Sequence, residues 1–160
     1  SLLDQGYKVQ FDIVGSGHDE NYFKCIVPEQ YKSQFIFHGW QDRTTVDLIL
    51  HKSYVVLFPS IYPEAFGISG IEAMMRAKPV VAFNVGGVST WLEHNKTGLL
   101  VQSLNQNEYT SAIKEIIDSK TKYKSFSLNA RSNALNYFTE KQHMTKLFKV
   151  YSNILNPNSI

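Results

Sequence analysis

Short apolar runs alternate with amphipathic stretches along most of the chain. The apolar runs are bounded by Gly, Pro or Ser and are too short for helices, which is the pattern of buried strands. They lie at residues 9–14, 34–38, 54–58, 79–83 and 98–101. Because each run is followed by a stretch of helical spacing, the pattern predicts an α/β fold, a doubly wound parallel sheet of the Rossmann-like kind.

The last third of the sequence predicts architecture rather than chemistry. Asn105 with Glu108, and Thr139 with Gln142, form capping-box patterns that open helices. Both helices carry an apolar stripe of the kind that faces a core. The first stripe is Ala112, Ile113, Ile116 and Ile117, and the second is Met144, Leu147, Phe148, Tyr151, Ile154 and Leu155. The turn-like residues 156–160 are expected to fray.

The segment between the third and fourth predicted strands holds the candidate chemistry. Glu64 lies in a loop that contains proline and glycine, and Glu72 lies about one turn into the helix that the loop opens. Helical side chains lean toward the N-terminus, so Glu72 is expected to reach the mouth of this helix. A carboxylate there suits a hydroxyl pair such as a ribose diol, and the amides of residues 66–68 are free to hold a diphosphate.

The alternative is that Glu64 is an ordinary loop carboxylate and Glu72 a solvated helix residue. The surrounding residues argue against it, because residues 59–74 read P-S-x-x-x-E-x-F-G-x-x-x-x-E-A-M and are followed by K-P-V-V-A and G-G. Together with the segments 11–17, 35–40 and 97–101, this pattern resembles the C-terminal, donor-binding domain of retaining glycosyltransferases of the GT-B fold, family four.

The resemblance implies a role for each matching position. Glu64 would contact the transferred sugar, Glu72 would hold the ribose, and the intervening amides would bind the diphosphate. Gly15 and Gly17 would let their loop pass close to a ligand, while Trp40 either lines a pocket for the base or is a core or rim residue. The expected catalytic residue is Glu64, and the expected donor-binding residues are Gly15, Gly17, Trp40, Glu64, Ala65, Phe66, Gly67, Ile68 and Glu72.

Two glycine turns and two departures from the family pattern complete the picture. The first turn, Gly15-Ser16-Gly17, lacks the third glycine of a dinucleotide fingerprint, because Glu20 stands there. The second turn, Gly86–Gly87, is expected to present its amides to the donor. Ala77 stands where relatives often have a glycine that ends the helix, and Thr90 stands where they often have an acidic residue.

Composition agrees with such a module. The chain has 160 residues, of which 43% are hydrophobic and 19% charged, and this suits a single domain over 1–160. A net charge of +2 is too mild to argue for nucleic acid. Cys25 is the only cysteine, so no internal disulfide is possible and a reducing compartment is the simpler assumption; the residue is interpreted as a packing residue. Lys120, Lys122 and Lys124 are interpreted as a solvated turn rather than an acidic-lipid contact.

The resemblance also implies that the chain is a fragment of a larger two-domain protein. The first strand-helix unit, with a basic pair for the diphosphate, and an acceptor-binding N-terminal domain would precede it. In the family strand order the missing strand is central. The resemblance therefore implies either a gap or a closed-up sheet between strands 9–14 and 54–58, and we expect partial closure or pairing with a partner chain there.

The implied function is transfer of a sugar, with retention, from a nucleoside diphosphate sugar to a hydroxyl acceptor in polysaccharide or glycolipid biosynthesis. No metal or other cofactor is expected, because no Asp-x-Asp pair, Cys/His cluster or P-loop occurs. The expected location is the cytoplasm, and a peripheral contact at the inner face of the membrane stays an open alternative. A nucleotide-sugar epimerase and a noncatalytic nucleotide-sugar-binding module remain as alternatives.

Overall fold

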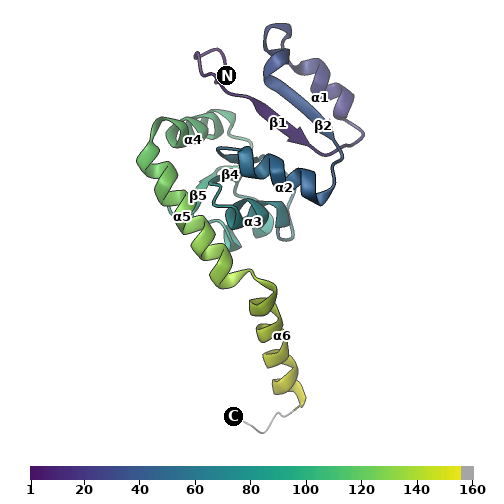
Figure 1. Cartoon of the computed structure of the whole chain (residues 1–160), viewed down its shortest axis with the longest axis vertical. Coiled ribbons are helices and arrows are strands. Elements are labelled where there is room, and N and C mark those ends of the chain that lie inside the picture. The colour runs from purple at the N-terminus through teal and green to yellow at the C-terminus, as the bar shows by residue number, and fades with distance from the viewer. Residues whose placement is uncertain (156–160) are drawn as a thin grey trace. The chain divides into compact units, whose positions relative to one another are not determined.

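The structure is a computed structural model that describes residues 1–155, so the turn expected at 156–160 lies outside it. The chain divides into two compact units, Ser1–Ser53 and Tyr54–Ile160, and parallel strands with helices build each of them (Figure 1). A single nucleotide-sugar-binding domain over 1–160 stays a prediction. The α/β class with parallel strands is confirmed.

Two parallel strands form the sheet of the first unit. β1 (Phe11–Val14) pairs with β2 (Phe35–Gly39), and the register shifts between Ile13 and Val14. The side chains of β1 alternate between half-buried and exposed, so this sheet has one covered and one open face. Its helical segments are α1 (Glu20–Ile26), the 3-10 turn η1 (Glu29–Gln34) and α2 (Arg43–Lys52), and Asp42 caps α2 by accepting a 2.8 Å hydrogen bond from the Thr45 amide.

A His-Asp pair links the two strands of this unit. The Nε2 atom of His38 lies 2.8 Å from Asp12 Oδ1, and the Gln10 amide donates to the same carboxylate at 3.0 Å. Burial acts to raise the pKa of Asp12, but the hydrogen bonds from His38 and Gln10 and the nearby charges outweigh it, so this pKa lies below its usual value of 3.8. The ionised form of Asp12 is therefore favoured by the fold.

Asp12→Asn is expected to lower the free energy of unfolding at pH 7 by about 0.5 kcal/mol, because solvent screens this partly exposed pair. A depressed pKa gives stability that is present above the unfolded value and is lost as the pH falls through the folded one. The difference between wild type and variant should therefore shrink as the pH falls below the usual value of 3.8. Urea unfolding at pH 7 and pH 3 measures it, and Asp19→Asn, beside the exposed His18, is the control that should change nothing.

The second unit contains a three-stranded parallel sheet in the order β3-β4-β5. Its strands are β3 (Val56–Phe58), β4 (Val80–Phe83) and β5 (Gly98–Val101). Every residue of the central strand β4 is buried, which explains its continuous apolar sequence. Tyr109 donates a 2.7 Å hydrogen bond to the Val81 carbonyl, and burial raises the pKa of this tyrosine, so the hydroxyl stays neutral and ties a helix to the sheet.

The helical segments of this unit follow the predicted alternation. They are α3 (Ile68–Met75), the 3-10 turn η2 (Gly86–Thr90), α4 (Gln106–Asp118), α5 (Lys120–Tyr137) and α6 (Glu140–Leu155). Both capping-box predictions are confirmed at the helix start. The Glu108 amide donates to Asn105 Oδ1 at 3.0 Å, and the Gln142 amide donates to Thr139 Oγ1 at 3.3 Å.

Three predictions about this part of the chain and its single cysteine are wrong. The segment 120–124 is the first turn of α5 and not a solvated turn, because Ser119 caps that helix through the Lys122 amide. Cys25 is exposed and does not pack in a core. The first apolar stripe is buried at Ala112, Ile113 and Ile116, but the stripe expected to be core on α6 is not, since that helix has no buried residue.

The two sheets answer the question of strand order. β1 and β3 belong to different sheets, so the sheet has not closed up between them, and the described strands are the five that the sequence predicts. Each strand lies within two residues of its predicted boundaries. The expected partial closure between these two strands is therefore wrong within this chain, and pairing with a partner chain stays a prediction.

Ala77 ends α3 in the left-handed conformation that glycine normally occupies. Its φ is +56°, its amide donates to the Met74 carbonyl at 2.9 Å, and the Lys78 amide donates to the Ala73 carbonyl at 3.0 Å. These two hydrogen bonds form a Schellman motif, which terminates the helix. The Cβ of alanine makes this conformation costly, so the strain expected from the sequence is present.

Ala77→Gly is expected to raise the free energy of unfolding by about 1 kcal/mol, because glycine adopts this φ without a Cβ clash. In a domain of this size the gain is a rise in melting temperature of roughly 2–4 °C. Differential scanning calorimetry measures it. Asn95→Gly is the matched control: Asn95 has a φ of +59°, but asparagine tolerates that region, so its gain should be smaller. A loss of stability in Ala77→Gly would contradict the assignment of strain.

Candidate functional site

The candidate site lies where β3 ends and α3 begins. The loop between them, residues 59–67, carries Glu64, which is half-buried. The Ser60 hydroxyl donates a 2.8 Å hydrogen bond to Glu64 Oε1. This bond fixes the direction of the carboxylate and leaves its other oxygen available to a ligand hydroxyl.

The second glycine turn supports this loop from behind. The Gly87 amide donates a 2.7 Å hydrogen bond to the Glu64 carbonyl. A Cβ at Gly86 would overlap the backbone of Glu64, and one at Gly87 would overlap the Ala65 carbonyl. The two backbones therefore touch, and only glycine permits this approach. The expectation that the turn presents its amides to a donor is corrected for Gly87, whose amide already has an acceptor inside the protein.

Thr90 takes part in the same turn. Its hydroxyl donates a 2.5 Å hydrogen bond to the Gly87 carbonyl, within the 3-10 turn η2. Thr90, which departs from the family pattern, thus closes this turn by a hydrogen bond within it. In this chain Thr90 therefore helps to shape the turn that supports the loop.

Trp91 is the main packing residue beneath the loop. It is 1% exposed, its Nε1 donates to the Phe66 carbonyl, and its ring meets Phe58 edge-on at 5.9 Å. A Cβ at Gly70 would overlap this ring. Gly67 has a φ of +84°, and a Cβ at this position would lie 3.0 Å from the ring of Phe58 and 3.4 Å from that of Trp91. The loop and the start of α3 are therefore both packed against the indole of Trp91.

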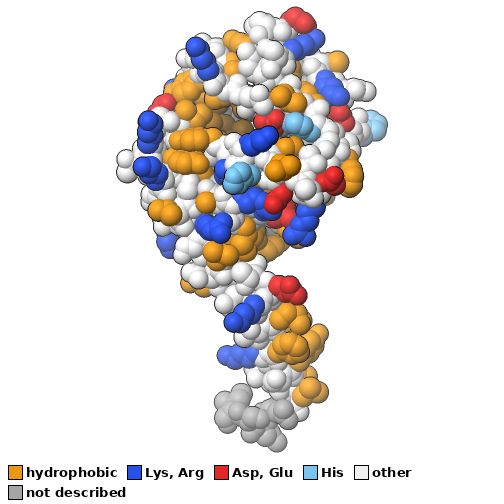
Figure 2. Space-filling view, in the orientation of Figure 1, with side chains coloured by type: hydrophobic (Ala, Val, Ile, Leu, Met, Phe, Trp, Pro, Cys, Tyr) orange, Lys and Arg blue, Asp and Glu red, His pale blue; other side chains and the backbone are white. Residues whose placement is uncertain are grey.

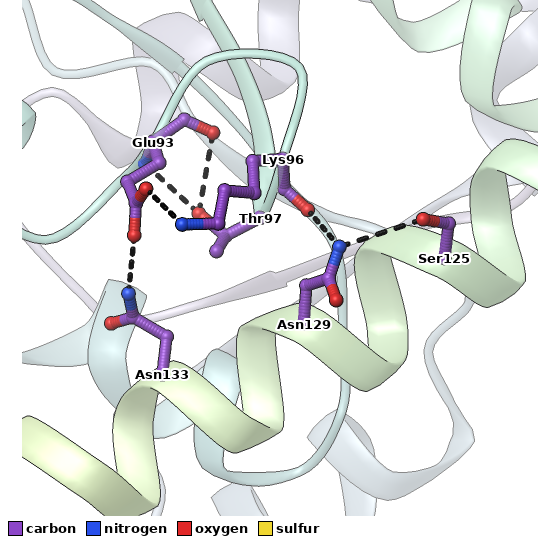
Figure 3. Close-up of polar contacts among 6 residues, drawn as sticks. All are labelled: Glu93, Lys96, Thr97, Ser125, Asn129 and Asn133. Carbon is purple, nitrogen blue, oxygen red and sulfur yellow. Dashed lines mark hydrogen bonds and ion pairs between the residues drawn. The ribbon is translucent and has the colours of Figure 1, made fainter.

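The segment after Trp91 is anchored to α5 by a polar network that Figure 3 shows. The Glu93 carboxylate accepts hydrogen bonds from Lys96 at 2.7 Å and from Asn133 at 2.6 Å. Asn129 donates to the Lys96 carbonyl at 3.0 Å. The buried Thr97 accepts from the Glu93 amide at 2.9 Å. These contacts keep the loop after Trp91 in place and so stabilise the position of the indole.

The outer face of α3 points away from this packing. Ile71, Ala73 and Met74 are buried, whereas Ile68 is 68% exposed and Glu72, one turn further along on the same face, is half-buried. The first amides of a helix have no acceptor within it, and the helix dipole makes this end attractive to anions. The helix start is thus accessible beside Ile68, with Glu72 placed to lean toward it.

Phe66 and Ala65 complete the loop. Ala65 is exposed, and Phe66 is 40% exposed with its ring 5.9 Å from that of Phe138 in an edge-to-face contact. Phe138 lies between α5 and α6. The loop backbone is therefore fixed at three places, by Gly87, by Trp91 and by the ring of Phe138.

The remaining predicted site residues belong to the first unit. Gly15 has a φ of +124° and its amide donates to the Gly39 carbonyl at 2.8 Å, which brings Gly15 and Trp40 to the same end of the β1–β2 sheet. Trp40 is 76% exposed, so it is not a core residue. Gly17 accepts from the Glu20 amide at 3.2 Å as α1 begins. The donor contacts of these three residues stay predictions.

Side chains that commonly bind metals do not gather in the described part of the chain. Within residues 1–155 no group of three or more His, Cys, Asp and Glu side chains is arranged to hold a metal ion. The expectation that no metal or cofactor is used stays a prediction.

The sequence missed the residues that shape the site without touching a ligand. Ser60 was visible only as part of the family pattern, and Trp91 carried no signal of its own, whereas Gly70 did. A glycine inside a helix costs about 1 kcal/mol relative to alanine, so its presence at position 70 was an available hint of close packing.

The comparisons with known proteins agree with the resemblance seen in the sequence. The family model described as glycosyl transferases group 1 matches residues 1–133, and the chain belongs to this family.

Two curated relatives and one solved structure illustrate the similarity. The chain is 27% identical over 146 residues, 90% of its length, to a poly(ribitol-phosphate) alpha-N-acetylglucosaminyltransferase of Staphylococcus aureus. It is 32% identical over 92 residues, 58% of its length, to a D-inositol 3-phosphate glycosyltransferase of Rhodococcus erythropolis. The crystal structure of Anabaena HepE in complex with UDP matches with a TM-score of 0.80 and 25% identity, covering 91% of this chain and 41% of that one.

The chain is much shorter than these proteins. It spans 29% of the Staphylococcus relative and 21% of the Rhodococcus relative. No helix within residues 1–155 is both long and apolar enough to cross a membrane.

Proposed function

We propose that this chain is the donor-binding half of a retaining glycosyltransferase that uses a nucleoside diphosphate sugar. The observation that carries the proposal is the fixed position of the loop. A hydrogen bond from Ser60 orients the Glu64 carboxylate, and one from the Gly87 amide holds the Glu64 carbonyl. The loop leads directly into the start of α3, where free amides suit a diphosphate. Family membership supports this assignment.

Each part of the donor has a proposed partner. The diphosphate lies at the amides of Ala65 to Ile68, where the helix dipole favours negative charge. Glu72, one turn further, accepts hydrogen bonds from the ribose hydroxyls, and Glu64 does the same for the sugar to be transferred. As the bond between sugar and phosphate breaks, negative charge grows on the leaving diphosphate, and the same amides stabilise it.

The names of the relatives help to decide whether this chain binds the donor or the acceptor. The two curated relatives act on different acceptors, poly(ribitol-phosphate) and D-inositol 3-phosphate, yet both are glycosyltransferases. What they have in common is the transfer of a sugar. We therefore assign this chain to the donor, and an acceptor-binding N-terminal domain to the part of the relatives' length that it does not span.

The donor class to test first is a uridine diphosphate sugar, because the HepE structure contains UDP. A thermal-shift panel of uridine, guanosine and adenosine diphosphate sugars tests the proposal. A ligand at 100 times its dissociation constant adds about 2.7 kcal/mol to stability. That is a rise of roughly 5–10 °C for a domain of this size. A panel without any shift would contradict donor binding by this chain.

Glu72→Ala separates specific binding from general charge effects. It is expected to remove most of the shift given by a uridine diphosphate sugar, because the ribose hydroxyls lose their acceptor. Glu140→Ala, in the first turn of α6, removes the same charge outside the site loop and α3 and should keep the shift. If Glu72→Ala binds the donor normally, the role assigned to this residue is wrong.

The two alternatives predict different products in the longer protein. Incubation with donor and no acceptor would yield an isomerised nucleotide sugar if the protein were an epimerase. A noncatalytic module would bind donor without turnover in the presence of any acceptor. Transfer with retention, read from the anomeric configuration of the product by NMR, is the result that the proposal requires.

A further inference from the structure

We propose that Trp91 is a positioning residue for donor binding, because its hydrogen bond to the Phe66 carbonyl sets the direction of the Gly67 amide. This inference rests on the proposed function and adds a residue to it. The side chain of Trp91 is 1% exposed and lies beneath the loop, so it does not reach a ligand itself. It acts only through the peptide group that joins Phe66 to Gly67.

The position of the indole donor is set by the packing around the ring. A buried indole N–H needs an acceptor, and that of Trp91 has one in the Phe66 carbonyl. The ring cannot turn freely, because Phe58 meets it edge-on at 5.9 Å and a Cβ at Gly70 would overlap it. Packing alone does not require this donor, since an apolar ring has no polar group to satisfy. The loop carbonyl is therefore directed by the indole, and not the reverse.

The hydrogen bond at the Phe66 carbonyl determines where the Gly67 amide points. The C=O and N–H groups of a trans peptide point in opposite directions, and none of the residues that the structure describes has a cis peptide bond. The carbonyl of the Phe66–Gly67 peptide is directed at the buried indole. The N–H of Gly67 is therefore directed away from the core.

The two preceding carbonyls also face the supporting side of the loop. The Glu64 carbonyl accepts from the Gly87 amide at 2.7 Å. A Cβ at Gly87 would lie 2.3 Å from the Ala65 oxygen but 3.0 Å from the Ala65 carbonyl carbon, so this oxygen points toward the glycine turn. The amides of Ala65, Phe66 and Gly67 therefore point away from the support. Within residues 1–155, none of these three amides donates to another group.

Three successive amides that point to one side suit an anion. Such a run, with a left-handed residue in it, forms the concave anion site called a nest, and Gly67 has a φ of +84°. Residues 59–75 contain no Lys or Arg. Figure 2 shows Lys and Arg side chains scattered over the visible face of the molecule and not gathered in one patch. The direction of each loop amide is therefore important for holding a diphosphate.

The indole also makes the Gly67 amide a stronger donor. Hydrogen bonds that follow one another through a peptide group polarise each other, so a peptide whose oxygen accepts a bond has an N–H that donates more strongly. Here the series runs from the Trp91 indole through the Phe66–Gly67 peptide to a phosphate oxygen. Both the direction and the strength of the Gly67 amide thus depend on the indole N–H.

The test compares uridine with uridine diphosphate in NMR titrations of the ¹⁵N-labelled chain. Both ligands contain the same base and ribose, so the ratio of their dissociation constants isolates what the diphosphate adds. Trp91→Phe is expected to lower this ratio on the order of tenfold and to leave the affinity for uridine unchanged. The Gly67 amide resonance should shift less with uridine diphosphate in the variant than in wild type. An unchanged ratio would overturn the proposal.

Tyr109→Phe is the matched control. It also removes a hydrogen bond from a buried ring to a backbone carbonyl, but this carbonyl belongs to Val81 in β4. It should lose stability for the same reason as Trp91→Phe and keep the wild-type ratio. A ratio lowered equally in both variants would show that general loosening of the fold weakens phosphate binding, and it would refute the role assigned to Trp91.

A second measurement needs no substitution at position 91. The chain contains two tryptophans, and a spectrum of Trp40→Phe without ligand identifies the indole N–H resonance of Trp91. Uridine diphosphate should shift this resonance, whereas uridine should not, because only the phosphates meet the loop amides. If bound uridine diphosphate leaves the resonance unchanged, this inference is wrong and donor binding stands. If wild type does not bind uridine diphosphate at all, the proposed function fails and this inference fails with it.

Discussion

Trp91→Ala is expected to lower the free energy of unfolding by about 3–5 kcal/mol, the largest effect on stability in this chain. The side chain is 1% exposed and fills the space left by Gly70 and beside Phe58. Its removal opens a cavity and leaves the Phe66 carbonyl without its indole donor. Because small proteins are stable by only about 5–15 kcal/mol, this change takes a large part of the total. Urea unfolding followed by far-UV circular dichroism measures it.

Two further tryptophan variants separate the loss of packing from the loss of the hydrogen bond. Trp91→Phe keeps much of the packing but loses the donor to the Phe66 carbonyl, so about 1–3 kcal/mol should be lost. Trp40→Ala changes the other tryptophan of the chain, which is 76% exposed, and should leave the free energy of unfolding within about 0.5 kcal/mol of wild type. If Trp91→Ala costs less than Trp91→Phe, the assignment of Trp91 as the packing residue under the loop is wrong.

The strands were predictable from the sequence because their signal is local. A run such as Val80–Phe83, with four apolar residues between a proline and an asparagine, has few other interpretations in an α/β chain. Helix starts were equally legible where a cap and its partner are three residues apart, as for Asn105 and Glu108. Both kinds of pattern are complete within a few residues, so no knowledge of the rest of the fold is needed.

Helix α5 and the exposure of α6 show where local reasoning fails. Helix α5 begins with three lysines in five residues, which suggested a turn. The segment is helical because it packs on α3 and α4. The stripe on α6 has the spacing of a core face, but spacing does not tell whether the structure supplies anything to cover that face. Burial depends on the arrangement of other elements, and a periodic pattern contains no information on that.

The candidate site likewise contains residues with a local sequence signal and residues that only the fold brings together. Glu64, Glu72 and the amides between them were found through a contiguous motif. The support from Gly87 and Trp91 was not, because these residues are more than twenty positions away from Glu64 and meet its loop only through the fold. A contiguous motif therefore identifies the candidate ligand contacts, whereas the residues that set the position of the loop become visible only in the fold.

Glu64→Gln in the longer protein is expected to lower kcat about a hundredfold, the largest effect on activity. The amide keeps the size of the side chain but loses the charge. Its single acceptor oxygen serves either Ser60 or a sugar hydroxyl, and its NH2 group donates where the other carboxylate oxygen accepted. A sugar held in a slightly wrong place loses reactivity steeply, because rate depends on alignment of the reacting atoms. Steady-state kinetics with a uridine diphosphate sugar measures the loss.

Binding of plain uridine diphosphate distinguishes the two carboxylates. This ligand lacks the sugar, so Glu64→Gln should bind it with wild-type affinity, whereas Glu72→Ala should bind it weakly because the ribose contact is lost. Ser60→Ala should lie between wild type and Glu64→Gln in kcat, with a loss of roughly tenfold, since the carboxylate is then present but free to rotate. If Glu64→Gln weakened uridine diphosphate as much as the diphosphate sugar, then Glu64 would act on the phosphates or on the loop, and its assignment to the sugar would have to be abandoned.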